Sequence, residues 1–157
     1  GLIISLKPIP YPEKAKGGKV REKAPIINQR KNMPKVFIVD DDEFLLDMYA
    51  VKFRESGFEI EVARGGEEAL AKIKSGYAPD AILLDIVMPG LDGFEMLRTM
   101  KKENLGAGSL VIILSNLGQK EDIARGLELG AKDYIVKAHF TPTEVVKKVE
   151  ALLEIKG

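Results

Sequence analysis

Several residue types and patterns are missing from this 157-residue chain. It has no cysteine, which excludes disulfide bonds, thiolate catalysis and cysteine-ligated zinc. The lack of cysteine also fits the cytoplasm, which is the location that we predict. No apolar run approaches the roughly 20 residues that cross a bilayer, so we expect no membrane span. What remains is 45% hydrophobic and 31% charged, a composition typical of a globular domain.

The net charge is zero, but the charges are unevenly distributed. Residues 1–35 contain nine Lys or Arg against two acidic residues, and the rest of the chain contains 15 basic against 22 acidic residues. Residues 1–34 also contain five of the eight prolines and a Gly-Gly pair, without a helical pattern. We therefore predict a basic, flexible leader or linker over residues 1–34 and one domain over residues 35–157.

Several roles are open for this leader. Its positive charge could tether the chain to nucleic acid, to membrane lipid or to an acidic face of the domain. The simpler interpretation is a linker or a remnant of cloning. The apolar stretch 2–6 could also be the last strand of a preceding domain.

From Lys35 onward, short apolar runs alternate with amphipathic segments. Because parallel strands need helical crossovers of one hand, this alternation predicts a doubly wound α/β fold. We expect a flavodoxin-like three-layer sandwich with five helices and a five-stranded parallel sheet in the order 2-1-3-4-5. The predicted strands are 36–39, 58–62, 81–84, 110–114 and 133–136, and the predicted helices are 43–56, 67–76, 93–103, 120–129 and 142–155.

Three details of this pattern predict local features of particular strands and helices. Residues 58–62 alternate apolar and acidic side chains, which predicts a half-exposed edge strand. Thr141, followed by Pro142 and Glu144, predicts a capping box at the start of the last helix. Gly126 lies inside the fourth helix and costs about 1 kcal/mol relative to alanine, which is compatible with a mobile surface.

Acidic residues follow two of the predicted strands. Asp40 and Asp41 come directly after the first strand, and Asp85 comes directly after the third. The carboxyl ends of neighbouring parallel strands meet at one edge, where ligands bind, so we expect the three carboxylates to converge. Crowded carboxylates repel one another unless a proton or a cation lies among them. Their hard oxygen ligands favour Mg²⁺ as that cation. Taken alone, Asp85 could equally cap the following helix or fill a turn.

Five motifs then follow one another along the chain: the pair Asp40-Asp41, the stretch 84–93 (Leu-Asp-Ile-Val-Met-Pro-Gly-Leu-Asp-Gly), Ser115 after an apolar strand, Tyr134, and Lys137. On these motifs the chain resembles the receiver domain of two-component response regulators, over about four-fifths of its length. The resemblance implies a phosphoacceptor signalling domain and not an enzyme, although such a domain assists its own phosphoryl transfer and slow autodephosphorylation.

The resemblance also implies a role for each site residue. Asp85 would accept a phosphoryl group from the phosphohistidine of a sensor histidine kinase. Asp41, Asp85 and the backbone carbonyl of Val87 would bind Mg²⁺ directly, and Asp40 would act through water. Lys137 would supply a fixed positive charge to the phosphoryl oxygens.

Ser115 and Tyr134 would form the switch. Ser115 would donate a hydrogen bond to the phosphoryl group, and Tyr134 would enter the space that Ser115 leaves. The surface formed by helix 120–129, strand 133–136 and helix 142–155 would then change for a downstream protein.

The residues two positions after Asp85 and two positions after Ser115 bear on how long a phosphoryl group would remain attached. Val87 and Leu117 occupy positions that influence attack by water in this family. Two apolar side chains there imply slow self-dephosphorylation.

The chain departs from the family pattern after Lys137, where Ala138 replaces the usual proline. A cis peptide before alanine costs roughly 3 to 4 kcal/mol, so either the bond is trans or the loop stores strain. His139 beside it is expected to be an exposed loop residue and not a ligand.

Three other functions are disfavoured by particular residues. A receiver-like module that no longer accepts phosphate would show a damaged acidic pair or lysine, and both are present. A magnesium phosphatase with an aspartyl nucleophile would need a general acid at Val87. A nucleotide-binding protein would need a Gly-rich loop after the first strand. We recognise no DNA-binding output domain, so we expect a stand-alone receiver or part of a larger regulator or hybrid kinase.

Overall fold

The computed structural model describes residues 33–155, which are built around a five-stranded sheet. All strands are parallel and lie in the order β2-β1-β3-β4-β5, as predicted. Each begins and ends within one residue of its predicted bounds. The predicted leader lies almost wholly outside the described residues. The strands are β1 (Lys35–Val39), β2 (Glu59–Ala63), β3 (Ala81–Leu84), β4 (Leu110–Ser115) and β5 (Asp133–Val136).

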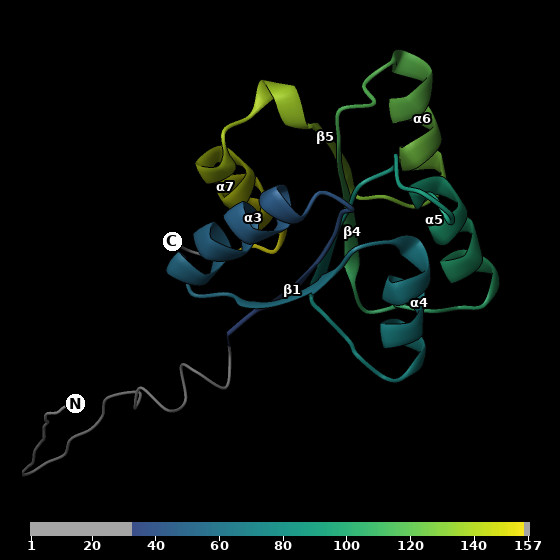
Figure 1. The fold of residues 1–157 in the computed structure, drawn as a ribbon, viewed down its shortest axis with the longest axis horizontal. Helices are drawn as coiled ribbons and strands as arrows, with labels where there is room; N and C mark the ends of the chain where they lie inside the picture. Colours follow the sequence, from purple (N-terminus) through teal and green to yellow (C-terminus); the bar gives the residue numbers. More distant parts are fainter. Residues whose placement is uncertain (1–32, 156–157) are drawn as a thin grey trace, which may run out of the picture. The chain divides into compact units, whose positions relative to one another are not determined.

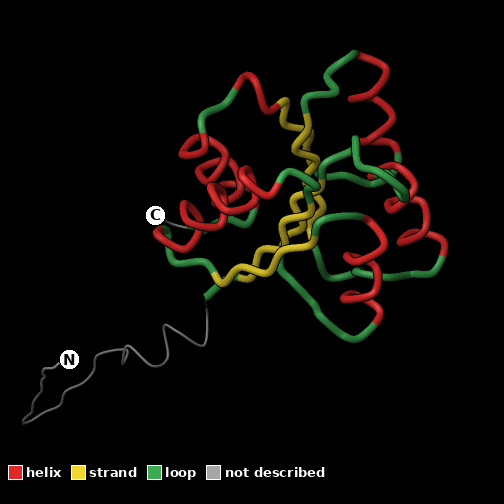
Figure 2. The backbone as a smooth tube through the Cα atoms, in the orientation of Figure 1, coloured by secondary structure: helices red, strands yellow, loops and turns green. Residues whose placement is uncertain are grey.

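Five α-helices cover the two faces of the sheet. Helices α3 and α7 lie on one face, and α4, α5 and α6 lie on the other (Figure 1). Figure 2 shows the strands between these two helical layers, which confirms the three-layer sandwich. No helix among residues 33–155 is both long enough and apolar enough to cross a membrane. The helices are α3 (Glu43–Glu55), α4 (Gly66–Lys74), α5 (Gly93–Lys102), α6 (Lys120–Glu128) and α7 (Pro142–Leu152), with a 3₁₀ helix η1 (Lys137–His139) after β5.

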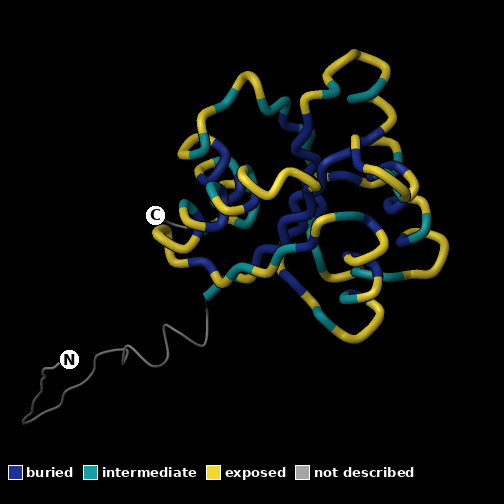
Figure 3. The backbone as a smooth tube through the Cα atoms, viewed as in Figure 1, coloured by how far each residue is buried: buried dark blue, intermediate teal, exposed yellow. Residues whose placement is uncertain are grey.

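The sheet separates two hydrophobic clusters. Neighbouring residues of a strand point to opposite faces, so Phe37 packs on the α4 and α5 side while Val36 packs on the α3 and α7 side. All four residues of β3 are buried, as its continuous apolar run predicts (Figure 3). On β2, Glu59 and Glu61 are exposed, which confirms the predicted edge strand.

Side-chain caps define where the helices begin. Asp42 caps α3, where its Oδ1 accepts the Leu45 N–H at 3.2 Å. The capping box predicted for the last helix is present, because Thr141 and Glu144 accept each other's backbone N–H groups. These caps fix the turns that follow β1 and β5, and both turns lead into the candidate site.

Candidate functional site

Three carboxylates meet at the carboxyl edge of the sheet. In the parallel pairing of β1 with β3, Val39 lies opposite Leu84, so the residues that follow them are neighbours. One oxygen from each of Asp40, Asp41 and Asp85 lies within 4.8 Å of the others. Asp40 and Asp85 are buried and Asp41 is exposed. The structure thus brings together the three acidic residues that sequence analysis selected.

The Asp85 carboxylate is held in place on both of its oxygens. Its Oδ1 accepts the backbone N–H of Ile86 at 2.7 Å and lies 3.4 Å from the N–H of Val87. Its Oδ2 accepts a hydrogen bond from the ammonium of Lys137 at 3.2 Å. The cap of α5 is Asp92, so the alternative that Asp85 caps this helix is wrong.

The backbone at Asp85 is further fixed by Gly93, the first residue of α5. The Gly93 N–H donates to the Ile86 carbonyl at 2.9 Å. A Cβ at position 93 would lie 2.4 Å from the Asp85 carbonyl oxygen and 2.8 Å from Ile86 Cα. Glycine is therefore required for α5 to approach this closely, a constraint that sequence analysis missed.

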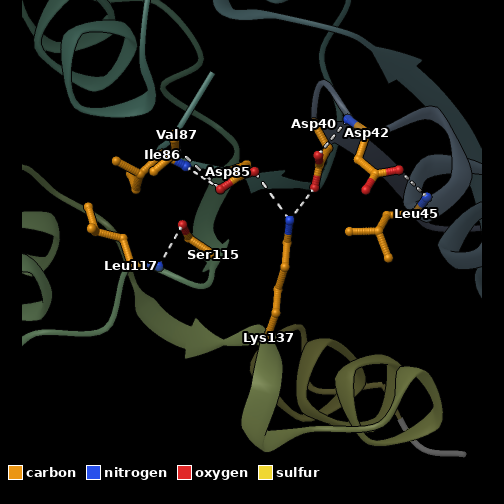
Figure 4. A network of polar contacts seen from close by, with 9 residues as sticks. All are labelled: Asp40, Asp42, Leu45, Asp85, Ile86, Val87, Ser115, Leu117 and Lys137. Carbon is orange, nitrogen blue, oxygen red and sulfur yellow. Dashed lines mark hydrogen bonds and ion pairs between the residues drawn. The ribbon is translucent and has the colours of Figure 1, made fainter. Parts of the chain in front are cut away.

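Lys137 reaches the cluster from η1, beyond the end of β5. Its Nζ lies 2.6 Å from Asp40 Oδ2 and 3.2 Å from Asp85 Oδ2, and its side chain is only 9% exposed (Figure 4). The described residues contain no cis peptide bond, so the bond from Lys137 to Ala138 is trans. The lysine thus lies between the two buried carboxylates with alanine in place of the family's proline.

Burial and charge oppose each other in this cluster. Burial raises the pKa of Asp40, and hydrogen bonds from Lys137 and the Asp42 N–H offset this only in part. Burial acts to lower the pKa of Lys137, but the Asp40 hydrogen bond and the Asp85 charge outweigh it, so the pKa is raised. Three carboxylates against one ammonium leave two excess negative charges when all are ionised. A divalent cation that prefers oxygen ligands fits this set of three carboxylates.

Ser115 and Tyr134 are joined through the backbone of one residue. Ser115 is fully buried, and its Oγ accepts the Leu117 N–H at 3.2 Å. The Tyr134 hydroxyl donates to the Leu117 carbonyl. Burial, and then the charges of Asp122 and Asp85, raise the pKa of Tyr134 to about 12, so at neutral pH it remains a donor. The sequence pairs Ser115 with Tyr134 by the family pattern, but no local pattern indicates this connection through Leu117.

The fold and site define a class of protein, and comparison with known proteins gives the same class. The response regulator receiver domain family matches residues 36–150, and the chain belongs to this family. It is 37% identical over 122 residues to the phosphate regulon transcriptional regulatory protein PhoB of Pseudomonas aeruginosa. It is 36% identical over 119 residues to the alkaline phosphatase synthesis transcriptional regulatory protein PhoP of Bacillus subtilis.

These alignments cover 78% and 76% of this chain but 52% and 48% of the two relatives. The chain therefore spans about half the length of the curated relatives that it matches. It is a receiver domain of the two-component type, with the phosphoacceptor role of that family.

Solved structures agree with this assignment. The receiver domain of the Francisella response regulator 1452 is 37% identical, with a TM-score of 0.70 over 77% of this chain and 97% of that one. A CheY-like receiver domain from Methanospirillum hungatei JF-1 gives 29% identity and a TM-score of 0.71, covering 78% and 95%. The BeF3-activated receiver domain of DrrB gives 30% identity and a TM-score of 0.67, covering 78% and 98%.

Proposed function

We propose that Asp85 is the phosphoacceptor of this receiver domain and that its donor is the phosphohistidine of a sensor histidine kinase. An Asp85 oxygen attacks phosphorus, the phosphorus–nitrogen bond breaks, and the imidazole nitrogen keeps the electron pair. The product is an acyl phosphate on Asp85. The observation that carries this proposal is a buried carboxylate held between backbone N–H groups and Lys137, beside two further carboxylates.

The carboxylates also support a magnesium site. Asp41 and Asp85, with the backbone carbonyl of Val87, would hold Mg²⁺ directly, and Asp40 would hold it through water. Bound Mg²⁺ supplies charge neutralisation for the phosphoryl oxygens as they approach Asp85. The two excess negative charges of the cluster support a divalent ion in this role.

Lys137 and Ser115 would contact the phosphoryl group after transfer. Phosphorylation removes the negative charge of the Asp85 carboxylate and places phosphoryl oxygens near the Lys137 ammonium. The Ser115 hydroxyl accepts a hydrogen bond from Leu117, which leaves its own proton available for donation. Both residues would thus stabilise the negative charge of the phosphoryl oxygens, which is present only after the phosphoryl group has been transferred to Asp85.

The connection through Leu117 suggests how phosphorylation would alter the surface. When Ser115 turns toward the phosphoryl group, its hydrogen bond with the Leu117 N–H breaks, and the Leu117 backbone, whose carbonyl accepts the Tyr134 hydroxyl, becomes free to move. Tyr134 then enters the space beside Ser115, and the surface of α6, β5 and α7 changes for a downstream partner. A differential affinity of a few kcal/mol is enough to bias the two states. Unchanged Tyr134 ring resonances on phosphorylation would contradict this switch.

The phosphoacceptor is tested with acetyl phosphate and Mg²⁺, followed by intact-mass measurement. We expect one added phosphoryl group on the wild type and none on Asp85→Asn. The matched control is Asp47→Asn, which makes the same change at an exposed site on α3 and should be phosphorylated like the wild type. Phosphorylation of Asp85→Asn, or no phosphorylation of the wild type, would overturn the proposal.

We also propose a cytoplasmic location, where a kinase domain could present its phosphohistidine. This is supported by the absence of a membrane-crossing helix in the described part and by the family of the chain.

A further inference from the structure

Helix α4 begins against the loop that leads from β3 into α5. Gly66, its first residue, is buried, and a Cβ there would lie 2.6 Å from the Leu91 carbonyl oxygen and 3.1 Å from Leu91 Cδ2. This oxygen belongs to the backbone, so it cannot rotate away as a side chain can. The next helix residue, Glu67, holds a carboxylate oxygen 3.1 Å from where a Cβ on Gly90 would lie. Two consecutive residues of α4 therefore face two consecutive residues of this loop.

The α5 side of the loop is fixed. Asp92, the cap of α5, accepts the Glu95 N–H at 2.9 Å, and Glu95 accepts the Asp92 N–H at 3.2 Å. The first residue of α5 also packs tightly on the Asp85 backbone. Because the start of α5 is held in this way, a displacement of Leu91 must be taken up by the loop residues that precede it. These include Val87, whose carbonyl is a proposed ligand of Mg²⁺.

We infer that Gly66 is a positioning residue for the metal ligand on this loop, and that it helps the site to select Mg²⁺ over Ca²⁺. The missing side chain at position 66 lets α4 approach the loop closely, and this contact sets the position of the Val87 carbonyl. The inference rests on the proposed function, since it concerns the magnesium site beside Asp85.

The selectivity follows from the different demands of the two ions. Mg²⁺ requires nearly ideal octahedral geometry at about 2.0–2.1 Å, whereas Ca²⁺ accepts a flexible set of oxygen ligands at about 2.3–2.6 Å. A methyl group at position 66 moves the loop away from α4, because the Leu91 backbone must shift. The Val87 carbonyl then moves with respect to the carboxylates of Asp41 and Asp85, which penalises the more exacting ion.

Gly65 provides a matched control one residue away. Its backbone is extended, with φ −173° and ψ 170°, and a Cβ there would meet no atom of residues 33–155 within 4 Å. Gly65 is the N-cap of α4, and alanine is a poorer cap than glycine. Gly65→Ala therefore weakens the start of α4 without pressing on the loop, so it separates the two effects.

The experiment measures the dissociation constants of Mg²⁺ and Ca²⁺ for the wild type, Gly66→Ala and Gly65→Ala, by titration followed through backbone amide resonances. We expect Gly66→Ala to weaken Mg²⁺ binding by about tenfold and Ca²⁺ binding much less. Gly65→Ala should bind both ions as the wild type does. Unfolding by urea is measured alongside, because partial unfolding lowers both affinities equally and leaves their ratio unchanged.

A second variant tests the same contact if Gly66→Ala does not fold. Leu91→Ala removes the Cδ2 that faces Gly66 and so loosens the loop against α4. It should lower the ratio of Mg²⁺ affinity to Ca²⁺ affinity in the same direction. Its control is Leu105→Ala, because Leu105 packs on the same hydrophobic cluster but precedes β4, at the opposite edge of the sheet. This control should leave the ratio unchanged.

An unchanged ratio in Gly66→Ala, or in Leu91→Ala where the first variant does not fold, would overturn the inference. So would an equal loss of both ions, or an effect of Gly65→Ala as large as that of Gly66→Ala. If Asp85→Asn weakens Mg²⁺ binding and the wild type is phosphorylated, these failures concern Gly66 alone. If Asp85→Asn binds Mg²⁺ like the wild type and Asp85 accepts no phosphoryl group, the proposed function fails, and the inference fails with it.

Discussion

At the scale of single residues, we expect Val87 and Leu117 to influence hydrolysis at Asp85. Val87 is 61% exposed, and both side chains line a surface pocket shared with Met88 and Phe94. Neither side chain can orient a water molecule by hydrogen bonding, so hydrolysis of an acyl phosphate on Asp85 should be slow.

Val87→Asn is expected to shorten the lifetime of the phosphoryl group. An amide at this position can hold a water molecule near phosphorus, and we expect hydrolysis to be about tenfold faster, below the 10²–10⁴ of full general base catalysis. The measurement is the loss of phosphoryl mass with time after the donor is removed. Val51→Asn, at an exposed valine on α3, is the matched control and should leave the lifetime unchanged. Equal or slower hydrolysis in Val87→Asn would show that the prediction is wrong.

Tyr77 should make the domain sensitive to alkaline pH. Burial, and then the charges of Glu61, Glu59 and Asp80, raise its pKa to about 12. The unfolded chain has a tyrosine pKa of about 10, so between these values the folded state binds more protons. The free energy of unfolding therefore falls as the pH rises from about 10 to 12.

The test of this linkage is Tyr77→Phe, which keeps the edge-to-face ring contact with Phe37 but cannot ionise. Its urea midpoint should decline less steeply with pH than that of the wild type. A residual slope is expected, because the pKa of Tyr134 is raised as well. Identical slopes for the two proteins would contradict the assignment to Tyr77.

At the scale of elements, the position of α5 decides the geometry at Asp85. The atoms that a Cβ on Gly93 would meet belong to the Asp85 and Ile86 backbone, which cannot rotate away as a side chain can. Gly93→Ala is therefore expected to reduce the free energy of unfolding by about 1–3 kcal/mol and to slow phosphorylation by acetyl phosphate.

Gly108→Ala is the matched control for this change, because a Cβ there meets no atom within 4 Å. Urea denaturation and the rate of mass increase should be measured for both variants. If Gly93→Ala behaves like Gly108→Ala, close packing of α5 does not position Asp85.

Most elements could be predicted because their signals are local. The apolar run of β3, the alternation in β2 and the capping box at Thr141 each depend on a few neighbouring residues. The constraints at Gly93 and Gly126 depend instead on backbone and rings that arrive from other elements. Propensity alone describes Gly126 as a weak point of its helix, and only tertiary packing shows what the glycine accommodates.

At the scale of the whole molecule, the strand order creates the site. Because β3 lies between β1 and β4, Asp85 is placed between the ends that carry Asp40 and Ser115. This convergence could be predicted from the acidic residues after two apolar strands. Lys137 was expected at the site from the family resemblance alone, because its reach depends on the path of η1 after β5 and on the burial of a flexible side chain.

The charge of the assembled cluster leads to a prediction for the stability of the entire domain. The three carboxylates come together only in the folded chain, so an ion bound there stabilises folding by linkage. Mg²⁺ at about 100 times its dissociation constant should add about 2.7 kcal/mol to the free energy of unfolding, and a chelator should reverse this gain. Asp85→Asn removes one proposed ligand and should show a much smaller rise in Tm on Mg²⁺ addition. Asp47→Asn should retain the full rise, and an equal rise in all three proteins would mean that Mg²⁺ acts elsewhere.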